Sequence, residues 1–80
     1  MGKRARPPPW RRHTKERARE RHGLNYSRKM RKEMISRIPL GEVLSTDPRG
    51  RQVIRISYQL EEIRVVYDPG LDDIVTILPK

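Results

Sequence analysis

The spacing of apolar residues changes in the middle of this chain, and this change constrains the fold more than any other feature. Before Pro39, apolar side chains recur three and four residues apart, which places them on one face of a helix. This stripe consists of Met30, Met34, Ile35 and Ile38. Ser27 can cap such a helix, and Pro39 with Gly41 ends it. The pattern therefore predicts a helix over residues 27–38.

After Gly41 the apolar side chains mostly alternate with polar ones, as they do in strands that bury one face. Four segments follow this pattern: residues 42–45, 51–58, 62–68 and 73–78. The first two are separated by the turn sequence Asp47-Pro48-Arg49-Gly50, which favours a hairpin. Short connections throughout predict an antiparallel meander.

A further helix is predicted over residues 14–22, with Thr14 as its N-cap and Gly23 as its C-terminal stop. Its only apolar residue is Ala18, so Leu24 and Tyr26 are expected to anchor it to the core. The fold class is then α+β: two N-terminal helices packed on a three- to four-stranded antiparallel sheet, whose other side is left free.

Residues 1–12 combine basic charge with three consecutive prolines, which predicts a disordered arm ahead of a small domain over residues 13–80. Trp10 in this arm has two interpretations. It can stack on an unpaired base, or it can fold back onto an apolar patch of the domain.

The chain has 80 residues and no cysteine, so it forms one small domain without disulfides or zinc-thiolate sites. It contains no apolar run of membrane-spanning length and no secretory signal pattern, which favours a cytoplasmic protein that does not contact membranes. We expect no cofactor.

Positive charge is concentrated in the first half of the chain. Residues 1–37 carry fourteen Lys and Arg against Glu16, Glu20 and Glu33, whereas residues 38–80 carry five basic and seven acidic residues. A charge so polarised attracts phosphate backbones, which makes RNA the expected partner. The expected RNA contacts in this half are Arg4, Arg6, Trp10, Arg11, Arg12 and Arg21. A solubilising basic surface without a ligand is the alternative.

Few residues are candidates for metal binding or catalysis. His13 and His22 with Glu16 and Glu20 lack the spacing and the electrostatic surroundings of a metal site, and the Asp68, Asp72 and Asp73 cluster is expected to consist of solvated turn residues. No phosphate loop and no nucleophile motif is present. His, Arg, Tyr and Thr suffice for metal-free RNA cleavage, in which histidine transfers protons and arginine stabilises phosphate charge.

His13, Arg17 and Arg21 fall four residues apart on one helical stripe and could serve such a reaction. The alternative for the same segment is a helix whose Glu16 and Glu20 pair with arginines three and four residues away. Periodicity alone favours this salt-bridged helix.

The order of these pieces resembles the small RelE-like and BrnT-like toxins of the barnase, EndoU, colicin and RelE fold. The segment His13-Thr14-Lys15-Glu16-Arg17-Ala18-Arg19-Glu20-Arg21-His22-Gly23-Leu24 is similar to a family opening of the form His-Ala-x-x-Arg-x-x-Glu-Arg-x-Gly-Ile, and Ile74-Val75-Thr76-Ile77-Leu78-Pro79 is similar to the family's last strand.

The resemblance implies a metal-independent endoribonuclease, encoded by a phage or mobile element, with an antitoxin as a further partner. His13 would act as acid or base, and Arg17, Arg55 and Arg51 would stabilise phosphate charge. Thr76 and Tyr58 would position the scissile group. Arg51 and Tyr58 are therefore added to the expected RNA contacts.

Three functions stay open from the sequence. The chain is a toxin-like endoribonuclease, a noncatalytic module that binds RNA or the ribosome, or a phage protein that binds a host polymerase or nuclease through its sheet or edge strand.

Overall fold

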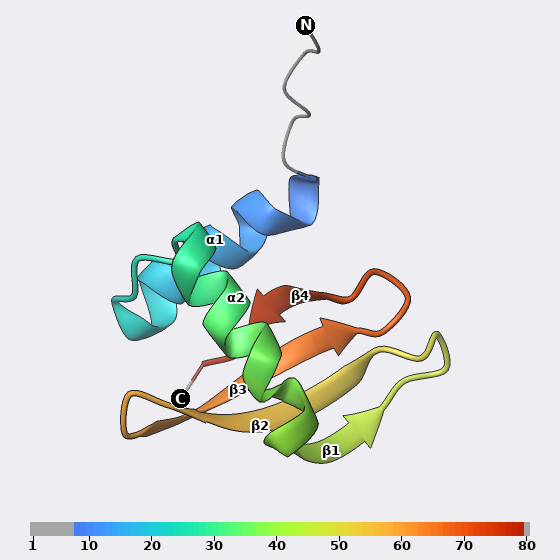
Figure 1. Cartoon of the computed structure of the whole chain (residues 1–80). Helices are drawn as coiled ribbons and strands as arrows, with labels where there is room; N and C mark the ends of the chain where they lie inside the picture. Colours follow the sequence, from blue (N-terminus) through green and yellow to red (C-terminus); the bar gives the residue numbers. More distant parts are fainter. Residues whose placement is uncertain (1–7, 80) are drawn as a thin grey trace, which may run out of the picture.

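The computed structural model describes residues 8–79 and confirms an α+β fold with two helices and a four-stranded antiparallel sheet (Figure 1). In chain order the elements are α1 (Pro9–His22), α2 (Arg28–Arg37), the 3-10 helix η1 (Ile38–Leu40), β1 (Glu42–Thr46), β2 (Gln52–Tyr58), β3 (Glu61–Asp68) and β4 (Asp73–Ile77). None of the helices in this part of the chain has the length and hydropathy needed to cross a membrane.

Helix α1 begins earlier than predicted, so the expected arm of residues 1–12 is wrong for residues 9–12. Proline is accepted at the first position of a helix, because its missing N–H has no partner there and its φ angle already suits the helix. Pro8 precedes the helix in an extended conformation and Pro9 opens it. Residues 1–7, with Arg4 and Arg6, lie outside the described residues.

Thr14 is not the N-cap that its sequence context predicted. It lies inside α1 and is fully buried, and its hydroxyl has two acceptors within reach: the carbonyl oxygen of Trp10 at 2.8 Å and that of Ile74 at 3.0 Å. The C-terminal prediction is confirmed, because Gly23 adopts a left-handed conformation with φ 65° and its N–H bonds the last turn.

Helix α2 begins where the sequence predicted. The Ser27 hydroxyl accepts a hydrogen bond from the Met30 N–H at 3.1 Å, and Met30 and Met34 are buried. The chain then passes through η1 into Gly41, where a Cβ atom would lie 2.8 Å from the carbonyl oxygen of Arg55. This close approach of two backbone segments explains why glycine occupies the position.

The sheet is the predicted meander, with strand order β1-β2-β3-β4 and strand limits within one residue of those expected. Asp47 organises the β1–β2 turn, because its carboxylate accepts hydrogen bonds from the backbone N–H groups of Arg49 and Arg51. Irregular pairing occurs between β1 and β2 at Val43/Ser45 and between β3 and β4 at Val66/Tyr67. Irregularities of this kind increase local twist.

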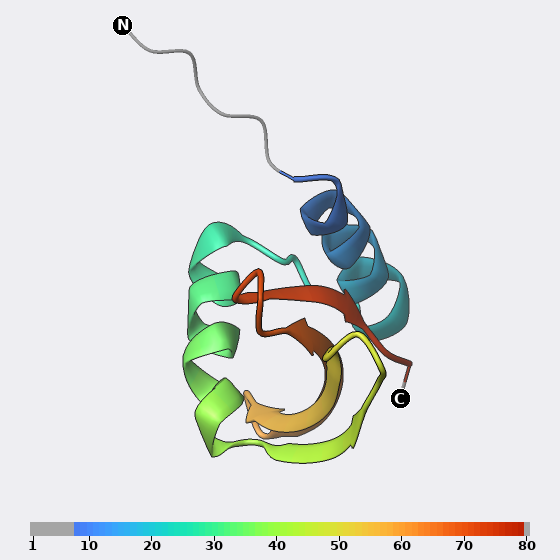
Figure 2. The same ribbon diagram turned by 90° about the vertical axis from the view of Figure 1, so that its right-hand side faces the viewer.

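The sheet curves strongly, and α2 lies across its concave side (Figure 2). The core between them is made of Tyr26, Met30 and Met34 with the inward side chains of the strands, joined by Ala18 of α1. The inward strand residues are Ile54, Ile56, Tyr58, Ile63, Val65, Ile74 and Ile77. The opposite face, which we call the outer sheet face, presents Arg55, Ser57, Glu62 and Arg64, all of them exposed.

Helix α1 lies beside the edge strand β4 (Figure 2) and hydrogen-bonds its backbone. Besides the Thr14 contact to Ile74, Arg21 donates to the carbonyl oxygen of Ile77 at 2.8 Å, and His22 donates to that of Leu78 at 2.8 Å. Side chains of α1 thereby satisfy carbonyl groups along this edge of the sheet. At the other edge every residue of β1 is exposed.

Candidate nucleic-acid interface

A buried carboxylate, Asp73, ties both helices to the start of β4. Its oxygens accept hydrogen bonds from Trp10 Nε1 at 2.7 Å, Arg11 Nε at 3.0 Å and Arg31 Nε at 2.9 Å, and from the Ile74 N–H at 2.9 Å. The Asp73 side chain is only 1% exposed. Burial by itself raises the pKa of Asp73, but the hydrogen bonds from Trp10, Arg31 and Arg11 outweigh burial and hold the pKa below its ordinary value.

The expectation that Asp73 is a solvated turn residue is therefore wrong. Its neighbour Asp72 is exposed and accepts a hydrogen bond from the Tyr67 hydroxyl, and Asp68 pairs with Arg51 at 3.2 Å. Nothing in the local sequence separates the three aspartates. Only the arrival of α1 and α2 over the start of β4 gives Asp73 its partners.

This network also decides between the two interpretations of Trp10. The indole N–H is bound to Asp73, and the side chain is half-buried against the domain. Trp10 thus lies on the body of the protein, where the second interpretation put it, but a carboxylate holds its indole N–H. Its neighbour Arg12 is exposed, with no ion-pair or hydrogen-bond partner for its side chain among residues 8–79.

His13 and Thr76, both predicted site residues, lie together although 63 positions separate them. The His13 Nε2 atom is 3.3 Å from the Thr76 hydroxyl. This contact follows from the docking of α1 beside β4, and His13 is otherwise exposed. Arg17, one turn further along α1, pairs with Glu20 at 2.7 Å, as the salt-bridged interpretation of this helix expected.

The strand register places Thr76 and Arg55 on the same outer sheet face. Thr76 pairs with Val66, Arg55 pairs with Arg64, and Val66 and Arg64 are two residues apart on β3. Residues two apart on a strand point to the same side. Arg55 lies two strands away from Thr76, and its guanidinium is paired with the carboxylate of Glu42.

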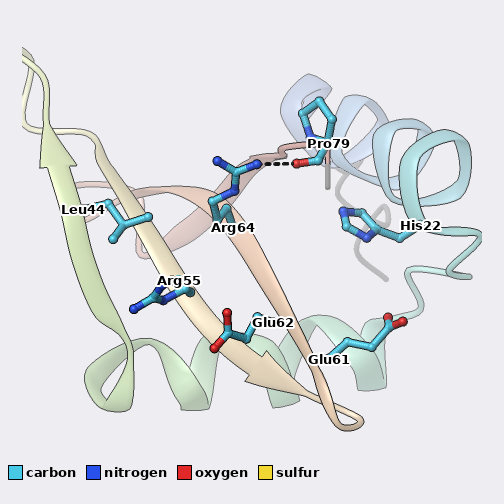
Figure 3. Close-up of a pocket in the computed structure, with 7 residues that line it drawn as sticks. All are labelled: His22, Leu44, Arg55, Glu61, Glu62, Arg64 and Pro79. Carbon is cyan, nitrogen blue, oxygen red and sulfur yellow. Dashed lines mark hydrogen bonds between the residues drawn. The ribbon is translucent and has the colours of Figure 1, made fainter.

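A shallow pocket of about 560 Å³ opens between the outer sheet face and the end of α1 (Figure 3). Its lining residues are His22, Leu44, Arg55, Glu61, Glu62, Arg64 and Pro79. Arg64 reaches across it and donates to the carbonyl oxygen of Pro79 at 2.9 Å. Three positive or protonatable groups and two carboxylates share this pocket, so its charge is mixed.

Sequence reasoning did not select Arg64 or His22 for the site. The alternation of β3 already indicated that Arg64 faces away from the core, and only the strand register shows that Arg64 lies directly opposite Arg55. His22 was considered for a metal site. Its Nε2 atom instead bonds the backbone after β4, while its Nδ1 atom is buried without a partner among the described residues.

The remaining predicted RNA contacts occupy different surroundings. Arg21 is half-buried at the β4 edge, and Arg51 is held by Asp68. Tyr58 is buried in the core, with the Arg37 guanidinium 5.9 Å from its ring centre. Its ring therefore faces the concave side and is not available on the outer sheet face.

Exposed positive charge is concentrated on the two helices. Within α1 and α2, only Arg11, Arg17 and Arg31 have a carboxylate partner among residues 8–79. Seven further basic side chains are exposed, and none has an ion-pair or hydrogen-bond partner in the described chain: Arg12, Lys15, Arg19, Arg28, Lys29, Lys32 and Arg37. The same part of the chain contains no group of three His, Asp or Glu side chains that could hold a metal ion.

Comparison of the chain with protein-family models, with curated proteins and with solved structures found no match. The resemblance to the RelE-like and BrnT-like toxins therefore stays a hypothesis. The arguments for function come from the charges and contacts described above.

Proposed function

We propose that this protein binds RNA through the basic side chains of α1 and α2. The observation that carries the proposal is the set of seven exposed cations on these helices that have no carboxylate partner in residues 8–79. The positive charges on this surface repel one another, because few carboxylates lie among them. Counterions or a bound polyanion reduce this repulsion. Phosphate groups neutralise such a surface most effectively, because binding releases the counterions condensed on the nucleic acid.

The arrangement of the charges supports a strand-shaped ligand. The exposed cations come from both helices and extend from Arg12 to Arg19 on α1 and from Arg28 to Arg37 on α2. Arginine contributes a planar fork that matches phosphate oxygens. The resemblance of residues 13–24 and 74–79 to toxins that cleave RNA favours RNA over DNA as the partner.

The direct test is binding of a fluorescein-labelled, single-stranded RNA 12-mer, followed by fluorescence anisotropy between 50 and 300 mM salt. We expect the logarithm of the affinity to fall linearly with the logarithm of the salt concentration, with a slope of about −0.7 for each phosphate contacted. The same sequence as DNA and as duplex RNA shows which nucleic acid is preferred. Salt-independent affinity, or no binding at 50 mM salt, would contradict the proposal.

A second candidate function, metal-independent RNA cleavage, is favoured by the contact between His13 and Thr76. In this reaction a base removes the proton from the ribose 2′-hydroxyl, whose oxygen attacks the adjacent phosphorus, and an acid protonates the leaving 5′-oxygen. His13 is exposed and can serve as base or acid, while Thr76 orients its ring. To bind the phosphate, Arg55 would have to leave its ion pair with Glu42. Arg64 would have to leave its hydrogen bond to the Pro79 carbonyl oxygen.

Cleavage is tested by incubating total RNA and translating ribosomes with the protein in EDTA. A ribonuclease of this type leaves a 2′,3′-cyclic phosphate, and His13→Gln abolishes the activity while RNA binding survives. Intact RNA in every sample, with binding preserved, would leave the protein a noncatalytic RNA-binding module.

A further inference from the structure

A groove of about 950 Å³ separates the N-terminal halves of α1 and α2, and its charge is entirely positive. Six basic side chains line it: Arg11, Arg12 and Lys15 from α1, and Arg28, Arg31 and Lys32 from α2. No carboxylate belongs to its lining. This distinguishes it from the pocket on the outer sheet face, where Glu61 and Glu62 accompany the arginines.

The buried Asp73 carboxylate holds two of these arginines, Arg11 and Arg31, in place. It contacts Arg11 and Arg31 through their Nε atoms, which leaves the N–H groups at the tip of each guanidinium for other acceptors. Arg11 is 40% exposed and Arg31 is 20% exposed, so both tips can reach a ligand. The two arginines are thus fixed before a ligand arrives, which lowers the conformational entropy lost on binding.

The other four cations of the groove are exposed and have no carboxylate partner in the described chain. Both helices also begin at this groove, and the positive ends of their dipoles add to its potential. The Tyr26 phenol forms part of the lining, and its buried hydroxyl has no hydrogen-bond partner among residues 8–79.

We propose that this groove is the primary binding site for the phosphates of single-stranded RNA. The inference rests on the proposed function and locates it. Its volume is in the range of sites that enclose a compact ligand, which suits a short stretch of strand. Pro8 and Pro9 add apolar surface against which a base can pack.

The groove and the His13 contact lie on different flanks of α1. Successive residues of a helix are about 100° apart, so Lys15 in the groove and His13 beside Thr76 point in nearly opposite directions. RNA held in the groove therefore does not need His13. Binding and any cleavage are separable by mutation.

The test compares two double variants that remove the same charge from the same two helices. Lys15→Gln with Lys32→Gln removes two groove cations, whereas Arg19→Gln with Lys29→Gln removes two exposed cations outside the groove lining. Lysine, arginine and glutamine have similar helix propensities, so both variants should fold. Affinity for the labelled single-stranded RNA 12-mer is measured at several salt concentrations, with circular dichroism as the check on folding.

We expect the groove variant to lose about tenfold in affinity at moderate salt and to reduce the salt slope by about 1.4. The control removes two cations of the wider basic surface that lie outside the groove, so it should lose clearly less, about threefold. Equal losses in both variants would overturn the groove but leave RNA binding standing. Absence of binding by the unmodified protein would overturn the proposed function itself. Displacement of the 12-mer by ATP at a comparable concentration would reassign the groove to free nucleotides and overturn the strand assignment.

Discussion

Replacing Asp73 with asparagine tests whether one buried carboxylate holds the two helices on the sheet. The substitution keeps the size of the side chain but removes its charge and replaces one acceptor oxygen with a donor. Arg11 and Arg31 then lose their carboxylate partner. The effect is expected in the stability of the whole domain, because Asp73 connects α1, α2 and β4.

The size of the effect follows from burial and solvent exposure. Removing one partner from a buried ion pair costs about 3–5 kcal/mol. Arg11 is 40% exposed and its pairing is screened by water, so the lower end of that range applies, about 3 kcal/mol. In a domain of this size each kcal/mol lowers the Tm by about 4–8 °C, which gives a decrease of about 12–24 °C for Asp73→Asn at pH 7.

Thermal unfolding followed by circular dichroism measures this decrease, and Asp72→Asn is the matched control. Asp72 neighbours Asp73 in sequence and accepts a hydrogen bond from Tyr67, but it is exposed. Its replacement should cost less than about 1 kcal/mol. A decrease for Asp73→Asn of less than about 4 °C, or one no larger than that of the control, would refute the reasoning.

The pH dependence gives an independent check. The pKa of Asp73 is lower in the folded protein than its ordinary value of 3.8, so its contribution to stability is complete above that value. The contribution is lost as the pH falls through the lower, folded-state pKa. The difference in Tm between the unmodified protein and Asp73→Asn should therefore be constant from pH 5 to 8 and shrink below about pH 4.

Two further predictions concern single contacts. Gly41→Ala should lower the free energy of unfolding by about 1–3 kcal/mol, because its Cβ would lie 2.8 Å from the carbonyl oxygen of Arg55. Urea unfolding measures this loss. Gly70→Ala is the control and should cost less, because the nearest atom to its Cβ would be a carboxylate oxygen of Asp68 at 3.3 Å. A hydrogen bond to Asp72, together with burial, raises the pKa of Tyr67 to about 12, and ultraviolet titration of Asp72→Asn should show one tyrosine shifted back toward 10. An unchanged titration curve would show that Asp72 does not raise the pKa of Tyr67.

The candidate site was only partly visible in the sequence. The family resemblance named His13 and Thr76 as separate site residues, and the structure brings the two side chains together. The groove between α1 and α2 was not foreseen, because it depends on which flanks of two helices face one another. Helical periodicity relates residues of one helix and carries no information on the distance between Lys15 and Lys32, which belong to different helices.

The sequence by itself determined the class of the fold. Helical spacing before Pro39, alternation after Gly41 and the Asp47–Gly50 turn specify two helices and a meander, because these patterns depend on local geometry and on burial of one face. Only the tertiary structure decided where the first helix begins and what Asp73 does. Trp10, Arg11 and Arg31 converge on that carboxylate from two helices, and their convergence draws residues 9–12 into the domain and opens the cationic groove above it.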